Sequence, residues 1–365
     1  MAKKKSQTKM VNTIMSQAEL VLDPHGATYV CWGEGHEKQV QPLEAKEVTH
    51  FISRFYVDGK KKFPSDHIIA GVKKELAFYA TERGQFRNIA TRVGHHDGAV
   101  YFDLGKPGVM RISKDRIKLV EESDILFIKP SNALSLPKPD PTAKNDDVKK
   151  LARFLNFSTE DRTLILAWLM SLFMHQGTLP LLSVSGKQGS AKSTALKTLK
   201  QTVDPCEAPL IGLPRTEEAL FIVSTSYKLM AIDNVSKISG GMSDAMCQLA
   251  SSGSHTGRKL YTNSELVVIK GRALIGINGI GVEITRPDLL SRTILVDALP
   301  LDGRHVTESQ LNRLFTKNHP AILGSIIKGV QTALKRHDSI TSNSTHRMAD
   351  LINWSICKVP FHRAS

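Results

Sequence analysis

Cysteine is scarce in this sequence, and long apolar runs are missing. The four cysteines stand at positions 31, 206, 247 and 357 and form no Cys-X-X-Cys pair. We therefore expect neither a disulfide framework nor a zinc site, and we expect a reducing, cytoplasmic environment. No segment approaches the roughly 18 consecutive apolar residues of a membrane-spanning helix. The basic first residues lead into no apolar stretch of the kind found in signal peptides.

Acidic residues are outnumbered, since 35 Asp and Glu stand against 49 Lys and Arg. The resulting net charge of +14 favours an anionic partner such as nucleic acid. The excess is spread along the whole chain, however, and a generally basic soluble protein would show the same balance. With 365 residues, 41% of them hydrophobic, the chain can form two or three domains with apolar cores.

Composition and pattern divide the chain into five segments. Residues 1–40 are polar and weakly patterned, which predicts a flexible basic segment. Helical and then β-like patterns predict a small α+β domain over 41–130. Clustered prolines indicate a linker over 131–146. The main domain is expected over 147–300, and a helical C-terminal region over 301–365.

The α+β segment changes its pattern part of the way along. Residues 43–82 are helical in pattern, with a basic interruption at 60–62. Two β-like runs follow at 89–93 and 99–104, and the Gly- and Asp-containing stretch at 94–98 between them predicts a hairpin turn.

The main domain is expected to be of the α/β class. Two helices, at 148–157 and 161–174, come first. Apolar strands then alternate with helical patterns, which predicts a parallel sheet flanked by helices. The expected strands are 181–185, 228–232, 272–277 and 293–296, and the expected helices between them include 193–201 and 243–251.

A loop of small residues joins the first of these strands to a helix. It runs Gly186-Lys187-Gln188-Gly189-Ser190-Ala191-Lys192-Ser193-Thr194. In this strand–loop–helix context, backbone N–H groups can surround a phosphate, and the N-terminus of the helix adds partial positive charge. We expect Lys192 to reach the β- and γ-phosphates of ATP and Ser193 to hold Mg²⁺. The rest of the nucleotide site would be Gly186, Gln188, Gly189, Ser190, Ala191 and Thr194.

One position departs from the usual form of this loop. Ala191 stands where a glycine commonly precedes the lysine, and we expect alanine to fit there with a negative φ. A chance Gly/Ser-rich turn is the alternative interpretation of the whole loop.

Polar residues end the next strands of the sheet. Asp233 follows an apolar strand 41 residues after Lys192, where a carboxylate that binds Mg²⁺ is expected. Asn234 takes the place of the glutamate that usually polarises water. It could orient the water, or it could cap a turn in a chain that hydrolyses ATP poorly. Asn278 ends the strand at 272–277 and could sense the γ-phosphate, or it could belong to a plain Asn-Gly turn.

Cations further along the chain have both functional and structural interpretations. Arg286 and Arg292 could act on the ATP of a neighbouring subunit, or they could be surface ion-pair residues. The segment 251–268 predicts a β-hairpin with polar residues at its tip. There Arg258 and Lys259 could contact DNA phosphates and Tyr261 could stack on a base, unless the hairpin is merely basic and solvated.

Together, these motifs resemble the ATPase module of phage- and plasmid-type primase–helicase proteins, which are AAA+ P-loop ATPases close to superfamily 3 helicases. The resemblance runs from Gly186 to Trp354. It is carried by the phosphate-loop residues, Val203-Asp204-Pro205, Ile232-Asp233-Asn234, Leu249-Ala250-Ser251-Ser252-Gly253, Asn278-Gly279, Thr285-Arg286-Pro287-Asp288-Leu289-Leu290-Ser291-Arg292 and Arg347-Met348-Ala349-Asp350. The stretch 92–104 is similar to the β-rich region upstream of such modules.

The resemblance implies an AAA+ core with a helical C-terminal lid, in a hexameric ring that moves along single-stranded or forked DNA. It implies catalytic roles for Lys192, Asp233, Asn278 and Arg292, and a second sensor at Arg347. A bacterial host and a phage or mobile element as the source follow from the same resemblance, as does a separate primase or polymerase as partner.

The segment before the ATPase has no paired-carboxylate motif, so priming is not predicted, and the tail predicts a shortened lid. An ATP-binding switch or loader protein is the second hypothesis, and a small-molecule kinase is the third.

Overall fold

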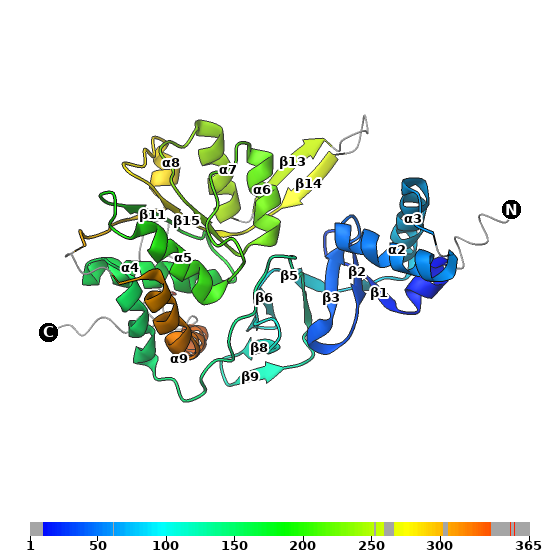
Figure 1. Ribbon diagram of the computed structural model, residues 1–365, viewed down its shortest axis with the longest axis horizontal. Coiled ribbons are helices and arrows are strands. Elements are labelled where there is room, and N and C mark those ends of the chain that lie inside the picture. The colour runs from blue at the N-terminus through cyan, green and yellow to red at the C-terminus, as the bar shows by residue number, and fades with distance from the viewer. Residues whose placement is uncertain are drawn as a thin grey trace.

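The computed structural model describes residues 10–60, 62–251, 253–258, 266–301, 306–336, 351 and 354. Side chains at 36, 59, 60, 255–258 and 266–268 lie outside the description as well. The molecule is elongated, with a small N-terminal unit at one end, a β-meander in the middle and a large α/β domain at the other end (Figure 1). Within the described part of the chain, no helix combines the length and the apolar character needed to cross a bilayer.

The N-terminal unit is a four-stranded sheet covered on one face by two helices. Its strands, in the spatial order β3-β2-β1-β4, are β1 (Ala18–Leu22), β2 (Thr28–Trp32), β3 (Gln39–Pro42) and β4 (Gln85–Phe86). The helices are α2 (Lys46–Lys60) and α3 (Asp66–Arg83), which confirms the helical stretch and its interruption. Leu20 and Val30 pack against Ile52 and Leu76 in the core between the sheet and the helices.

The expected boundary at residue 40 is wrong, because three strands lie within residues 18–42. A tight turn joins β1 to β2: Asp23 Oδ1 accepts the N–H groups of His25 and Ala27, both at 2.8 Å, and Gly26 has a φ of +82°. The turn sequence Asp-Pro-His-Gly between two apolar runs was the available signal. A short 3₁₀ helix, η1 (Gly35–Glu37), separates β2 from β3.

A four-stranded antiparallel meander follows the N-terminal unit. It consists of β6 (Val93–His96), β7 (Ala99–Asp103), β8 (Val109–Ile112) and β9 (Ile117–Val120), while β5 (Asn88–Ala90) and β10 (Ile125–Phe127) pair in parallel beside it. Phe102 packs edge-on against Phe173 of the α/β domain, with ring centroids 5.1 Å apart. The meander therefore shares the core of the α/β domain and does not form one domain with the N-terminal helices.

The proline-rich segment at 131–146 is bound to its surroundings along its length. The N–H of Leu134 donates to Pro205 O at 3.0 Å, and that of Leu136 donates to Leu104 O at 2.9 Å. Further along, the N–H of Asp140 donates to Pro320 O at 2.9 Å. The segment expected to be a linker is therefore held in place: the residues between the prolines keep their N–H donors, and these fasten the segment to the meander and to the α/β domain.

The α/β domain is built on a parallel sheet in the order β12-β15-β11-β16. Its strands are β11 (Leu181–Ser185), β12 (Leu229–Ile232), β15 (Leu274–Asn278) and β16 (Thr293–Asp297). Helices α4 (Thr159–Met170) and α5 (Lys192–Val203) cover one face, and α6 (Glu217–Ser226) and α7 (Gly240–Ala250) cover the other. The expected parallel sheet flanked by helices is confirmed.

Several details of this domain differ from the sequence expectation. The stretch expected to be an α-helix at 148–157 is a 3₁₀ helix, η2 (Asn145–Phe154). Its buried residues, Val148, Leu151 and Phe154, recur every three positions, which matches the three residues per turn of a 3₁₀ helix. After α4, one 3₁₀ turn, η3 (Ser171–Phe173), replaces the end of the expected helix at 161–174.

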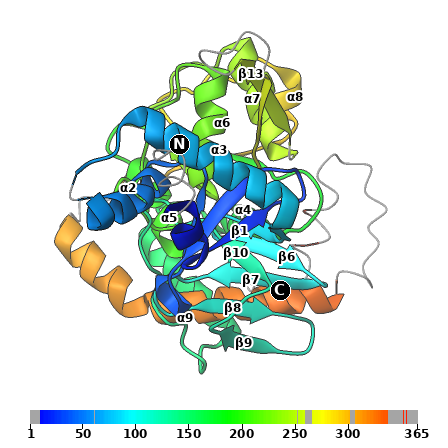
Figure 2. The ribbon, with the colours of Figure 1, turned by 90° about the vertical axis from the view of Figure 1, so that its right-hand side faces the viewer.

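The C-terminal helix lies against the body of the molecule. α9 (Glu308–Arg336) packs on η2 and on α5, and it runs beside the meander (Figure 2), where Gln331 Nε2 donates to Ser113 O at 3.1 Å. The described part of the C-terminal region is thus packed on the core. Arg347, the expected second sensor, lies outside the described residues.

Candidate functional site

The loop between β11 and α5 is shaped by residues with positive φ. Gly186 has a φ of +138°, and a Cβ there would lie 2.9 Å from Ala298 O, so a side chain has no room. Gly189 has a φ of +77°, and a Cβ there would meet no other atom within 4 Å. Ala191, the N-cap of α5, has a φ of 64° in the left-handed region. The expectation of a negative φ for Ala191 is wrong: the loop needs the glycine-like conformation, and alanine adopts it with strain.

Lys192 turns back over the loop that precedes it. Its Nζ donates to Gly186 O and to Lys187 O, both at 2.7 Å, and to Ser190 Oγ at 3.4 Å. The ammonium group therefore lies at the concave side of the loop. A cation in that place can transfer its hydrogen bonds from the loop to the oxygens of a phosphate.

Three polar side chains meet where the carboxyl ends of neighbouring strands come together. Ser193 Oγ donates to Asp233 Oδ1 at 2.8 Å, and Asn278 Nδ2 donates to Ser193 Oγ at 3.3 Å. β15 lies between β11 and β12, so the ends of all three strands reach the same edge of the sheet. A hydroxyl and a carboxylate at this distance are the oxygen ligands that Mg²⁺ takes together with substrate phosphates. The donor set fits the expected metal.

Asn278 also fixes the backbone next to Asp233. Asn278 is 2% exposed, and its Oδ1 accepts the N–H of Asn234 at 2.9 Å. Asn234 has a φ of 59°, and asparagine is among the few residues that adopt this conformation readily. The backbone therefore gives a structural reason for an amide in place of a glutamate. That Asn234 orients water stays a prediction.

A cavity of about 640 Å³ opens beside the loop. Residues 189–194 form one wall, residues 152–156 with Arg162 form a second, and Leu301, Val306 and Leu311 form a third. Asn156 connects the first two walls to the segment after β16, because its Nδ2 lies 2.5 Å from Leu299 O and 3.5 Å from Ser190 O. The second wall was missed from the sequence, because no local motif identifies the segment at 152–156 as part of the site.

The two candidate arginines lie away from this cavity. Arg292 O accepts the N–H of Leu181, the first residue of β11, at 2.9 Å, so Arg292 stands at the edge of the sheet opposite the loop. Its side chain is 20% exposed and pairs with Asp288 at 3.4 Å. Arg286, just before α8 (Pro287–Leu290), is 54% exposed and pairs with Asp244 at 3.3 Å. Neither belongs to the lining of the cavity beside the loop of its own chain, and a role across a subunit interface stays a prediction.

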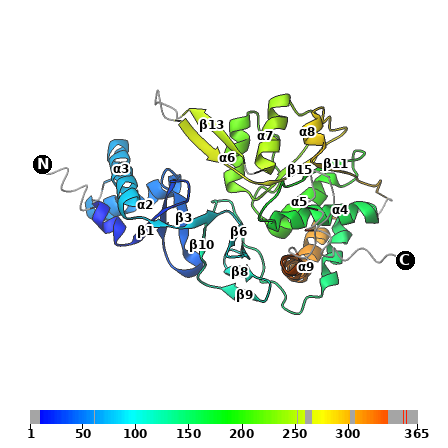
Figure 3. The same cartoon turned by 180° about the vertical axis from the view of Figure 1, so that it is seen from behind.

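The expected hairpin is present and extends away from α6 (Figure 3). It is formed by β13 (Ser254–Arg258) and β14 (Leu266–Lys270), which pair antiparallel. At its base, Lys270 Nζ lies 3.0 Å from Nδ1 of His25 in the N-terminal unit. The side chain of Arg258, and Lys259 and Tyr261 altogether, lie outside the described residues, so the proposed DNA contacts stay predictions.

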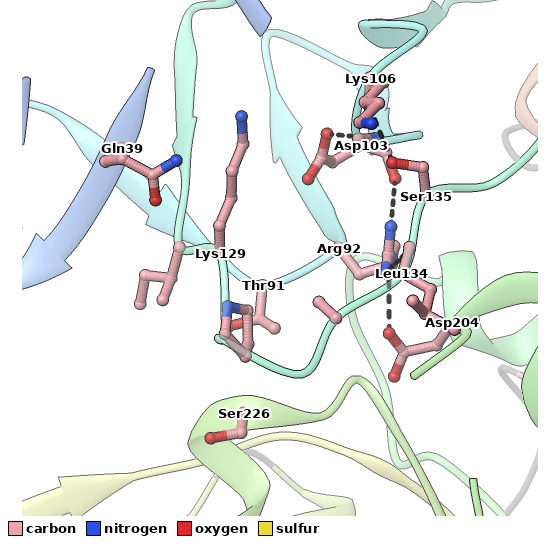
Figure 4. Close-up of a pocket in the computed structure, with 14 residues that line it drawn as sticks. Gln39, Thr91, Arg92, Asp103, Lys106, Lys129, Leu134, Ser135, Asp204 and Ser226 are labelled. Atoms are coloured by element: carbon pink, nitrogen blue, oxygen red, sulfur yellow. Dashed lines mark hydrogen bonds and ion pairs between the residues drawn. The ribbon is translucent and has the colours of Figure 1, made fainter. Parts of the chain in front are cut away.

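A buried ionic cluster fastens the meander to the far end of α5 (Figure 4). Arg92 has a φ of 60°, is 5% exposed, and donates to Asp204 Oδ1 and to Asp103 O, both at 3.1 Å. Lys200 of α5 donates to Asp204 Oδ2 at 2.6 Å. Burial alone would raise the pKa of Asp204, but the charges of Lys200 and Arg92 outweigh it and lower that pKa. A small cavity of about 130 Å³ adjoins the cluster.

The solved structures that this chain resembles have low sequence identity to it and low TM-scores. The C-terminal region of NrS-1 gives a TM-score of 0.44 at 13% identity, with 89% of this chain and 73% of that chain covered. A second structure of that region gives 0.47 at 11% identity, with 95% and 74% covered. JCV helicase bound to an acetamide compound gives 0.29 at 12% identity, with 58% and 60% covered. At these values the similarity carries no statement about activity.

The comparison with curated proteins gives no match. A family comparison, by contrast, covers residues 148–358, which is more than half of the chain and includes the loop, the ends of the strands and the hairpin. The chain belongs to the family of actinomycete integrative conjugative element replication proteins.

Proposed function

We propose that this replication protein is an ATPase that moves along single-stranded or forked DNA as a ring, as AAA+ helicases of the superfamily 3 type do. The observation that carries the proposal is the meeting of Ser193, Asp233 and Asn278 beside the loop that Lys192 closes. The order of the sheet, in which β15 separates the strand before the loop from the strand before Asp233, supports it.

Each group of the site has a task in this proposal. The loop N–H groups and Lys192 bind the β- and γ-phosphates of ATP, and Ser193 and Asp233 hold the Mg²⁺ ion. Bound there, Mg²⁺ would neutralise charge on the phosphates. Asn278 holds the backbone at Asn234 in place and lies within reach of a γ-phosphate. Arg292, or Arg286 in its place, acts on the ATP of the neighbouring subunit in a hexameric ring.

A second candidate is an ATP-binding switch or loader that hydrolyses ATP slowly and recruits replication partners, among them a separate primase or polymerase. The specific observation in its favour is Asn234, where an amide held in a left-handed turn follows Asp233 and no carboxylate can accept a proton from water. Steady-state phosphate release with and without single-stranded DNA separates the two candidates. DNA-stimulated hydrolysis supports the motor, and negligible turnover supports the switch.

The proposal is tested first by calorimetric titration of the full chain with ATP and Mg²⁺. We expect binding by the wild type and its loss in Lys192→Ala, with the fold of both proteins checked by circular dichroism. Lys187→Ala is the matched control, because Lys187 belongs to the same loop but contributes only its carbonyl to Lys192. A folded wild type that binds no ATP would rule out the motor and the switch together.

A further inference from the structure

The cavity beside the phosphate loop carries more positive charge than the loop alone accounts for. Arg153, Arg162 and Lys192 are the charged residues among the described ones that line it, and no carboxylate belongs to that lining. Glu160 and Asp161 precede Arg162 in the first turn of α4 but do not line the cavity. A cavity lined by cations and by no carboxylate of the described residues favours an anion as its ligand.

Arg162 uses one edge of its guanidinium group for a hydrogen bond within the protein, and the other edge makes none with the described residues. Its Nε donates to Leu155 O at 2.9 Å, which ties α4 to the end of η2. Neither of its Nη atoms has a hydrogen-bond acceptor or an acidic partner among the described residues. A planar group fixed by one donor presents its remaining donors in one direction, and two parallel donors match the oxygens of a phosphate.

The wall that carries Arg162 is fixed against the phosphate loop. Ser158 Oγ caps α4 by accepting the N–H of Asp161 at 3.0 Å, so the first turn of the helix is held in place. Asn156 bridges to Ser190 O and Leu299 O, which keeps the wall next to the loop. Arg162 and Lys192 therefore line the same cavity from two elements that are joined through Asn156.

We infer that Arg162 donates to phosphate oxygens of the bound nucleotide within its own chain. The inference rests on the proposed function, in which the loop at 186–194 holds the nucleotide. A triphosphate needs more positive charge than one lysine and one Mg²⁺ ion supply, and Arg162 provides it without a neighbouring subunit. Arg153 stands on the same wall but is exposed, so it contributes less.

The test compares Arg162→Lys with Arg162→Gln in the full chain. Both variants lose the bond from Nε to Leu155 O, but only lysine keeps the charge. The affinity for ATP with Mg²⁺ is measured by calorimetry over a salt titration, together with the melting temperature. Because a charge-assisted hydrogen bond contributes about 1.5–3 kcal/mol, we expect the glutamine variant to bind ATP about 10-fold or more weakly and with a flatter salt dependence. The lysine variant keeps the charge but not the paired donors, so it should lose less affinity than the glutamine variant and keep the salt dependence of the wild type.

Arg313→Ala is the control for a change in total charge, because Arg313 is exposed on α9 and does not line the cavity. Equal losses of affinity in the lysine and glutamine variants, with unchanged salt dependence, would show that Arg162 only holds the cavity wall in place. That result would overturn the inference. Wild-type affinity in the glutamine variant would overturn it too, while leaving the proposed function intact. Absence of ATP binding by the wild type itself would remove the proposed function.

Discussion

The hydroxyl of Ser193 donates to the carboxylate of Asp233 at 2.8 Å, although the two residues are 40 positions apart in the chain. Ser193 belongs to the first turn of α5, and Asp233 follows β12. The pair is brought together because the loop before α5 and the end of β12 lie at the same edge of the parallel sheet. This contact defines where a metal ion would be held between protein and phosphate.

Replacing Ser193 by alanine should remove the advantage that Mg²⁺ gives to ATP binding. We expect the ratio of dissociation constants measured with EDTA and with Mg²⁺ to fall toward one, since the hydroxyl is one of the two proposed protein ligands of the metal. Thr198→Ala is the control, because the Thr198 hydroxyl donates to Thr194 O within α5 at 2.8 Å and does not face Asp233. A ratio in Ser193→Ala equal to that of the wild type would contradict the metal assignment.

Ala191→Gly should stabilise the protein slightly. Alanine at a φ of 64° bears a left-handed backbone cost of about 1–2 kcal/mol, which glycine avoids, while glycine loses about 0.5–1 kcal/mol of entropy on folding. We expect a net gain of about 0.5 kcal/mol in the free energy of unfolding, measured by urea titration. Gly189→Ala is the reverse exchange at a φ of +77°, and it should destabilise by about 1 kcal/mol. A loss of stability in Ala191→Gly, or a gain of stability in Gly189→Ala, would contradict the backbone explanation.

The parallel sheet and the loop between β11 and α5 could be predicted because their signals are local. An apolar strand, a loop of small residues and Lys192 are contiguous in the sequence. The positions of Asp233 and Asn278 at the ends of strands imply a common edge once the sheet is parallel. The conformation of Ala191 could not be read in this way, since residue size does not reveal the sign of φ.

The remainder of the architecture depends on contacts between distant residues. Arg92 stands inside a β-like run at 89–93, but the structure breaks that run at Arg92 to place its guanidinium on Asp204, 112 positions away. The tip of the expected hairpin accordingly moves to Asp97 and Gly98, between β6 and β7. No periodicity in the sequence signals such a pair, and the same holds for Asn156 against the phosphate loop.

Arg92→Ala should destabilise the protein strongly. The substitution removes one partner of a buried ion pair, and such losses cost about 3–5 kcal/mol. It also leaves the carbonyl groups of Asp103 and Leu134 without the donors that Arg92 supplies at 3.1 and 3.0 Å. The midpoint of urea unfolding measures the effect, with Arg313→Ala as an exposed control expected to change stability by less than about 0.5 kcal/mol. Similar midpoints for the two variants would show that the ionic cluster around Arg92 contributes little to the stability of the folded protein.

His95 should make the folded protein less stable in mild acid. Burial lowers its pKa to about 3, and its Nε2 lies 3.0 Å from Phe173 O. In the unfolded chain the imidazole takes up a proton below a pH of about 6.5, whereas the folded protein keeps it neutral. Stability therefore falls as the pH falls from about 6.5 toward 3, by up to about 1.4 kcal/mol per pH unit. His95→Gln should reduce this slope in urea titrations between pH 4 and 7, and an unchanged slope would show that other groups cause it.

Replacing Arg258 and Lys259 by alanine should weaken the binding of single-stranded DNA while leaving ATP binding intact. The two residues stand in and just after β13, on the hairpin that extends from the α/β domain. Each lost contact with a DNA phosphate should reduce the slope of log affinity against log salt by about 0.7. Fluorescence anisotropy of a labelled oligonucleotide across a salt titration measures that slope. Lys270→Ala is the matched control, because Lys270 lies at the base of the same hairpin and contacts His25. If the double variant kept the wild-type slope, the hairpin would not contact the DNA backbone. The proposed ring would then have to bind the DNA strand through other residues.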